Sequence, residues 1–376
     1  MCKAFKSSSP TKNNGESSKM NKRIHYIDNL RWMTVSLLIL FHAGIAYNTW
    51  GEANYIFFEE VRPFASIVTF IDPWFMPLMF LLAGISSRFS LQKRGYGSFI
   101  KERLLRLGIP LIFGLLVMNP VLSFIADVTH NGYTGGYFEH YTVYFSRFTD
   151  LTGYDGGFTL GHFWFVLILL VISFLSCPII RLIPKSRKLT IITGFALSVM
   201  SVALFDVRSF GKPLLTFLCV YLLGYFVFSD QKFIKQLSRY KWTLTAVFLI
   251  VSVGDAILFN YTARFEALNT ICCYASFVTG VLSLTALGHD YLDFSNRFSS
   301  LNAKISYVFY MIHFPIVIVC QYLLSLTGMD NLANFFVTLL ITYPLTWSLC
   351  LLIEKTKYIR VLFGMKKNLQ NTREAQ

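Results

Sequence analysis

Residues 161–183 read GHFWFVLILLVISFLSCPIIRLI, and four basic residues lie between Arg181 and Lys188 at the end of this stretch. A helix that crosses a bilayer needs about 20 mostly apolar residues. Basic residues gather at the cytoplasmic ends of such helices. The stretch therefore predicts a transmembrane helix whose carboxyl end lies in the cytoplasm.

Further apolar stretches of similar length predict an all-α, polytopic membrane protein with about ten transmembrane helices. Of 34 Lys and Arg residues, five lie in loops assigned to the outside, and one, Arg31, starts the first span. The others lie in segments assigned to the cytoplasm, so both termini are predicted to be cytoplasmic. The predicted spans are 30–50, 66–87, 104–125, 161–183, 189–206, 212–229, 241–261, 266–288, 304–326 and 332–353.

The composition excludes several classes of protein. The chain is 54% hydrophobic and 14% charged, whereas soluble domains carry about 25% charged residues. A soluble cytosolic enzyme and a disordered protein are therefore excluded. The net charge of +14 is assigned to the cytoplasmic rim, so no nucleic-acid partner is expected. We expect a disordered cytoplasmic tail over 1–22, a membrane domain over 23–360 and a basic cytoplasmic tail over 361–376.

Ionisable side chains inside a span are costly and commonly line a cavity or contact a partner. The first span carries Arg31 and His42, which are about three helical turns and about 16 Å apart and so lie on nearly one face. His42 lies in the outer half, where an imidazole can take a proton from a hydroxyl group. The alternative is a buried histidine that is hydrogen-bonded to a neighbouring helix.

The second span contains Asp72, followed by Pro73 and Pro77. Prolines free backbone groups, which a polar cavity can satisfy. Asp72 lies at a depth similar to that of His42, so its carboxylate is a candidate for orienting the imidazole. The alternative is an aspartate that caps a helix after the break.

Two arginines lie at the cytoplasmic edge of the third span. Arg103 and Arg106 are three residues apart, so on an α-helix they share a face. Paired guanidinium groups suit phosphate, which arginine binds through two hydrogen bonds. The alternative is contact with anionic lipid headgroups.

Polar residues also mark the ninth span and the longest outer loop. Ser306, Tyr310 and His313 form one stripe on the ninth span, at spacings of four and three. The outer loop, about 126–160, is rich in glycine and tyrosine. Its rings suit stacking against sugars, and the alternative is an aromatic belt at the membrane interface.

These elements, in this order, resemble the integral-membrane acyltransferase-3 family, and the resemblance covers about residues 23 to 360. Met79–Gly84 departs from the family pattern, because alanine stands at Ala83 where serine is usual. The branch that contains glucan-modifying succinyltransferases is the most similar, and no fused esterase-like domain is expected. The motifs are Ile27-Asp28-Asn29-Leu30-Arg31 with Phe41-His42-Ala43, Phe80–Gly84, Arg103-x-x-Arg106, His162-x-Trp164-Phe165, and Ile305-Ser306-Tyr307-x-x-Tyr310-x-x-His313-x-Pro315.

The resemblance implies transfer of an acyl group, acetyl or succinyl, from cytoplasmic acyl-CoA to a hydroxyl group of a glycan or related acceptor at the outer face. It places the protein in a bacterial plasma membrane and requires no metal. His42 matches the family's essential histidine, and Arg31 matches the arginine paired with it. Arg103 and Arg106 match the pair held to contact the acyl donor.

On this basis His42 is predicted to act as general base on the acceptor, oriented by Asp72. Tyr310 or His313 is predicted to stabilise the oxyanion. Direct transfer and an acyl-histidine intermediate are both open at this point. The rival function is a transporter or flippase of a lipid-linked or secreted carbohydrate, which also has broken helices and polar residues at depth. Release of thiol from acyl-CoA distinguishes the enzyme from the transporter.

Overall fold

The computed structural model describes residues 24–183, 186–209, 211–262 and 264–365. Within these ranges the chain is helical, and its only β pairing is an isolated bridge between Ser209 and Lys212. The all-α prediction is confirmed. The predicted tail over 1–22 and most of that over 361–376 lie outside the described residues.

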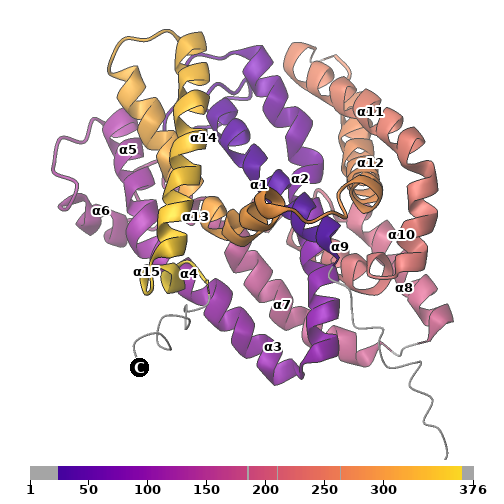
Figure 1. Cartoon of the computed structure of the whole chain (residues 1–376). Coiled ribbons are helices and arrows are strands. Elements are labelled where there is room, and N and C mark those ends of the chain that lie inside the picture. The colour runs from indigo at the N-terminus through magenta and orange to yellow at the C-terminus, as the bar shows by residue number, and fades with distance from the viewer. Residues whose placement is uncertain (1–23, 184–185, 210, 263, 366–376) are drawn as a thin grey trace, which may run out of the picture.

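Ten helical rods in the described part of the chain correspond to the ten predicted spans (Figure 1). Several are built from consecutive pieces, including π-helical turns. The rods are α1 (His25–Ile45), α2 (Arg62–Lys93), the segment Tyr96–Asn131, which comprises α3 (Tyr96–Arg103), η1 (Leu104–Gly108), α4 (Ile109–Phe113), η2 (Gly114–Met118) and α5 (Asn119–Asn131), then η3 (Gly161–Phe163) with α7 (Trp164–Leu182), α8 (Arg187–Ala203), α9 (Leu214–Leu223) with η4 (Gly224–Phe228), α10 (Gln231–Leu237) with η5 (Ser238–Tyr240) and α11 (Lys241–Tyr261), α12 (Glu266–Tyr291), α13 (Arg297–Ser325) and α14 (Asn331–Lys355).

Seven of these rods are long and apolar enough to cross a bilayer, as judged by length and composition among the described residues. The other three are α1, which carries Asp28 and Arg31, and two shorter apolar helices, Lys188–Ala203 and Leu214–Phe228. A multi-pass membrane protein is confirmed. Ten crossings stay a prediction.

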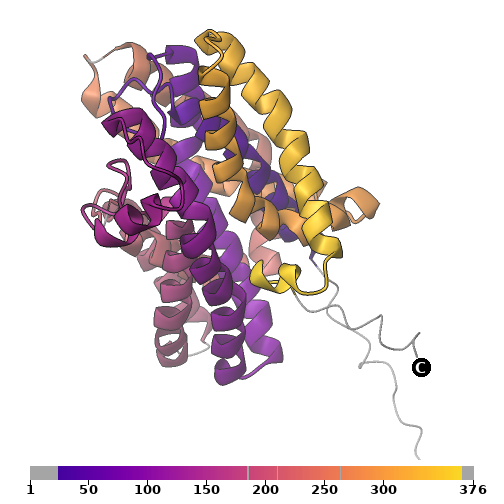
Figure 2. The ribbon, with the colours of Figure 1, turned by 90° about the vertical axis from the view of Figure 1, so that its left-hand side faces the viewer.

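Hydrogen bonds identify two opposite ends of the bundle. At the first, which we call the basic end, Asn29 near the start of α1 donates to the carbonyls of Leu292 and Phe294 at 2.7 and 2.8 Å, and Lys304 of α13 pairs with Glu354 of α14 at 2.5 Å. At the second, the loop end, Asn260 of α11 accepts a hydrogen bond from Thr49 in the loop after α1 at 2.7 Å and donates one to Thr69 of α2 at 2.9 Å. Figures 1 and 2 show the α1–α2 and α13–α14 connections at the top, and α15 (Ile359–Leu362) near the bottom.

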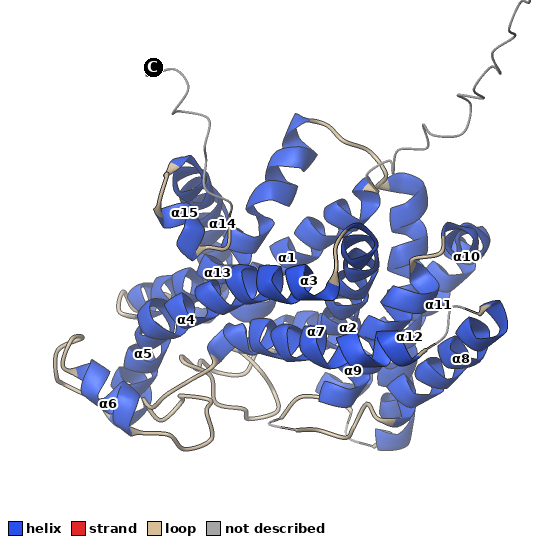
Figure 3. Ribbon diagram, turned by 90° about the horizontal axis from the view of Figure 1, so that it is seen from below, coloured by secondary structure: helices blue, strands red, loops and turns tan. Residues whose placement is uncertain are grey.

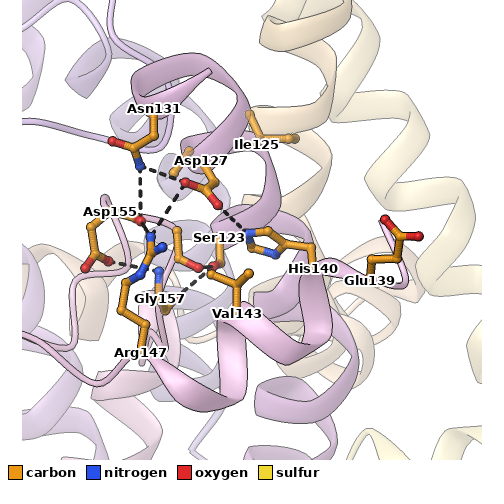
Figure 4. A network of polar contacts seen from close by, with 12 residues as sticks. Ser123, Ile125, Asp127, Asn131, Glu139, His140, Val143, Arg147, Asp155 and Gly157 are labelled. Carbon is orange, nitrogen blue, oxygen red and sulfur yellow. Dashed lines mark hydrogen bonds and ion pairs between the residues drawn. The ribbon is translucent and has the colours of Figure 1, made fainter. Parts of the chain in front are cut away.

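The long loop after α5 is fastened to the bundle by a buried carboxylate (Figure 4). Asp127 accepts hydrogen bonds from Asn131 at 2.8 Å and from His140 of α6 (His140–Ser146) at 3.1 Å, and it lies 3.7 Å from Arg147. Burial lowers the pKa of His140, although the Asp127 carboxylate opposes this shift. A neutral His140 is therefore the donor in this bond. Both interpretations of the loop's aromatic residues remain open, since Phe138 is exposed and Tyr144 is buried.

Two glycines let α2 and the α9–η4 rod touch through their backbones. A methyl group on Gly84 would overlap the carbonyl oxygen of Tyr221, and one on Gly224 would overlap that of Leu81. Close helix crossings of this kind in membranes rely on small residues. The glycine kept at the end of Met79–Gly84 is thus explained by packing.

We expect Gly84→Ala to lower the free energy of unfolding by about 1–3 kcal/mol, because the added methyl group forces the two backbones apart. Thermal unfolding of the purified protein in detergent measures the change. Gly97→Ala is the control, since nothing lies within 4 Å of a methyl group placed there. Equal stability of the two variants would contradict the packing explanation.

Candidate active site

Three histidines from separate parts of the chain meet inside the bundle. The ring of His313, in α13, lies 5.3 Å from that of His42, in α1, and 5.2 Å from that of His162, in η3, measured between centroids. His162 and His313 are buried. α1 packs against α2, α12, α13 and α14, and in the view of Figure 3 it lies among these helices. His42 of the predicted first span and His313 of the predicted ninth span therefore lie in one cluster.

A proline accounts for the position of His162. Pro315 has no N–H group, so the carbonyl of Met311, four residues earlier in α13, loses its helical donor. The Nε2 atom of His162 lies 2.9 Å from that carbonyl oxygen. In the other direction, the hydroxyl of Tyr310 donates to the carbonyl of His162. The two bonds fasten η3 to α13.

Backbone carbonyls fix the protonation pattern of two rings. A carbonyl oxygen only accepts, so the histidine nitrogen that bonds to it carries the hydrogen, and in a neutral ring the other nitrogen keeps its lone pair. In His162 the hydrogen is on Nε2, toward Met311. In His313 it is on Nδ1, which lies 2.6 Å from the carbonyl of Tyr310. Nδ1 of His162 and Nε2 of His313 are therefore buried acceptors, and neither has a hydrogen-bond partner among the residues that the structure describes.

The same hydrogen bonds involve Tyr310 and His313, the two residues expected to stabilise the oxyanion. The Tyr310 hydroxyl is already used by the carbonyl of His162. The single hydrogen of a neutral His313 ring is used by the carbonyl of Tyr310. Both residues belong to the site, but neither has a free donor in this arrangement.

His42, the member of the cluster from α1, lies three residues before the end of that helix at Ile45. Its ring stacks on Phe314 at a centroid distance of 3.9 Å, and its Nδ1 is buried without a hydrogen-bond partner. Asp72 is exposed. In the described part of the chain, no hydrogen bond joins it to His42. The expected carboxylate–imidazole pair is not formed.

The charge of one lysine, Lys212, reaches both His42 and Asp72. Its Nζ lies 4.7 Å from the ring centroid of Trp164, one residue of the His162-x-Trp164-Phe165 motif. Lys212 therefore contacts Trp164 directly and acts on His42 and Asp72 through its charge.

At the basic end, two adjacent serines of α2 bind the predicted arginines. Arg31 donates to Ser86 at 2.8 Å and also contacts Asp28 at 3.2 Å. Arg103 donates to Ser87 at 2.8 Å, and the hydroxyl of Tyr221 donates to the same oxygen at 2.6 Å.

Arg106 has a different environment from Arg103. It lies 3.5 Å from Glu102 and is exposed. A π-helical turn begins at Leu104, between the two arginines, so the α-helical spacing used to place them on one face does not hold there. Such turns are frequent at functional sites.

A groove of about 420 Å³ lies between α1, α13 and α14. Asn302 and Trp32 line it toward the basic end, and Ser306 and Phe309 line it further in. The Phe309 ring is parallel to that of His313, at 6.3 Å. Ser306 of the predicted stripe therefore faces this groove, while Tyr310 and His313 belong to the histidine cluster.

The sequence reasoning did not include His162, Ser86 or Ser87 among the site residues. His162 opens an apolar span at its outer edge, where polar residues are ordinary, and Pro315 was the signal for a free carbonyl opposite it. Nothing in the sequence marks the two serines as partners of the arginines. Among the described residues, no group of three or more His, Cys, Asp or Glu is arranged to hold a metal ion.

Comparison with known proteins identifies the family of the chain. The family described as an acyltransferase domain matches residues 24–353, which include every residue of the site. Neither the curated proteins nor the solved structures give a match. The family match favours an enzyme over a transporter. Because it spans almost the whole membrane bundle, the chain belongs to the acyltransferase-3 family.

Proposed function

We propose that this membrane acyltransferase moves an acetyl or succinyl group from cytoplasmic acyl-CoA to a hydroxyl group of an extracytoplasmic glycan or related acceptor. The observation that carries the proposal is the position of the histidine cluster. It lies inside the bundle, with Arg31 and Arg103 toward the basic end and Asp72, Lys212 and Trp164 toward the loop end.

The basic end suits the acyl donor. The phosphates of coenzyme A are strong acceptors, and arginine binds such groups through paired, charge-assisted hydrogen bonds. Arg106 is exposed for this contact. Arg103 is held by Ser87, whose hydroxyl oxygen also accepts a hydrogen bond from Tyr221.

The loop end suits a sugar. An exposed carboxylate and an ammonium group hydrogen-bond to hydroxyl groups, and an indole face packs against the apolar side of a sugar ring. Asp72 thereby acts on the acceptor rather than on His42.

The chemical step needs a base beside the acceptor. His42 removes the hydroxyl proton, the oxygen attacks the thioester carbonyl, and the C–S bond breaks to release the coenzyme A thiolate. The C–O bond of the product ester forms in the same exchange. We favour this direct transfer over an acyl-histidine intermediate, because one nucleophile and one base complete it.

His42→Ala is expected to reduce kcat for acyl transfer by a factor of about 10²–10⁴, the usual contribution of a general base. Transfer from radiolabelled acetyl-CoA or succinyl-CoA to a glycan acceptor, with purified protein in proteoliposomes, measures it. His25→Ala, at the start of the same helix, is the control. Full transfer by a normally folded His42→Ala variant would sink the assignment.

Reversing the charge at Arg103 and Arg106 to glutamate should raise KM for acyl-CoA about 10- to 100-fold, as expected from losing a charge-assisted hydrogen bond. KM for the acceptor should stay unchanged, because that substrate binds at the other end. Lys101→Glu, an exposed charge reversal on the same helix, is the matched control. Unchanged binding of acyl-CoA by the double variant would refute a donor site here.

A further inference from the structure

The proposed transfer leaves one proton to be moved. The acceptor hydroxyl loses it when the ester forms, and the coenzyme A thiolate gains it when the C–S bond breaks. His42 lies on the acceptor side of the bundle, whereas the donor enters from the basic end. A second group beside His42 can hold this proton while the C–S bond breaks.

His313 has the properties of that group. Its neutral ring keeps a bare lone pair on Nε2, which is buried and without a partner. His42 is its neighbour, with ring centroids 5.3 Å apart, close enough for ring nitrogens to be joined directly or through one water molecule. Leaving a buried acceptor unpaired is costly, so Nε2 is disposed to accept a hydrogen bond or a proton from His42.

Backbone carbonyls stabilise the charged form of His313. Its Nδ1 lies 2.6 Å from the carbonyl oxygen of Tyr310 and 3.2 Å from that of Phe309. These oxygens occupy the place that an aspartate takes beside histidine in a catalytic triad, where it holds the tautomer and stabilises the imidazolium. His162 adds a second acceptor, because its Nδ1 is also bare and its ring centroid lies 5.2 Å away.

We propose that His313 is a proton-relay residue: Nε2 of His313 takes the proton that His42 removes from the acceptor and returns it to the leaving thiolate. His162 accepts a hydrogen bond from the transiently protonated ring. The proposal rests on the proposed function. It assigns His313 the role of an acid and base, in place of the oxyanion donor that its position in the sequence suggested.

His313→Gln tests the relay, because glutamine is of similar size but has no basic nitrogen. We expect kcat to fall about 100-fold or more, with KM for acyl-CoA and for the acceptor unchanged. His130→Gln is the control, since His130 also contacts a backbone carbonyl, that of Asn54 at 2.5 Å, but lies outside the cluster. A His313→Gln variant with the kcat of the wild type overturns the relay.

A second measurement reads the ring in the wild-type protein. Nitrogen-15 NMR of the wild-type protein, labelled at histidine and with the His313 signals assigned by their loss in His313→Gln, reports the tautomer of that ring. The relay requires hydrogen on Nδ1 and a bare Nε2 in His313, and the opposite tautomer overturns it. If the wild-type protein transfers no acyl group to any glycan tested, the proposed function itself fails and the relay falls with it.

Discussion

The carbonyl of Met311 is the point on which the arrangement of the site depends. Pro315 deprives it of its helical hydrogen bond, and His162 supplies the missing donor from another part of the chain. The Tyr310 hydroxyl binds the carbonyl of His162 in return. These bonds satisfy polar groups in a region where water is scarce, which is a strict requirement inside a membrane. They also fix the His162 ring and bring it beside His313, so the proline in α13 shapes the histidine cluster.

The helices near this cluster pack closely at two glycines. Gly84 and Gly224 bring α2 against the α9–η4 rod, and the same part of α2 carries Ser86 and Ser87. Arg31 and Arg103, which come from different helices, are thus fixed on neighbouring residues of one helix. In the proposed function, this fastening places the donor-binding charges at a set depth below the histidines.

Much of the fold was predictable from the sequence, because apolar length and the distribution of basic residues are strong signals in a membrane protein. The same signals gave the depth of His42 and His313, and the structure brings these two residues together. Depth does not reveal which helices are neighbours, however. Asp72 was matched to His42 by depth alone, yet Asp72 is exposed and forms no hydrogen bond with that ring in the described structure.

The sequence also did not reveal which polar groups hydrogen-bond to one another. The role expected of Tyr310 assumed a free hydroxyl, but the carbonyl of His162 uses it. The spacing of Arg103 and Arg106 assumed an α-helix, but a π-helical turn begins between them. Ser86 and Ser87 are ordinary residues in sequence, and only packing makes them partners of the arginines.

The central claim is that the donor and the acceptor reach one histidine cluster from opposite ends of the bundle. Proteoliposomes of uniform, known orientation test it, with labelled acyl-CoA on the side of the basic end and a glycan acceptor on the side of the loop end. The account predicts that the labelled acyl group appears on the acceptor across an intact bilayer. Transfer only when both substrates are on the same side would contradict it.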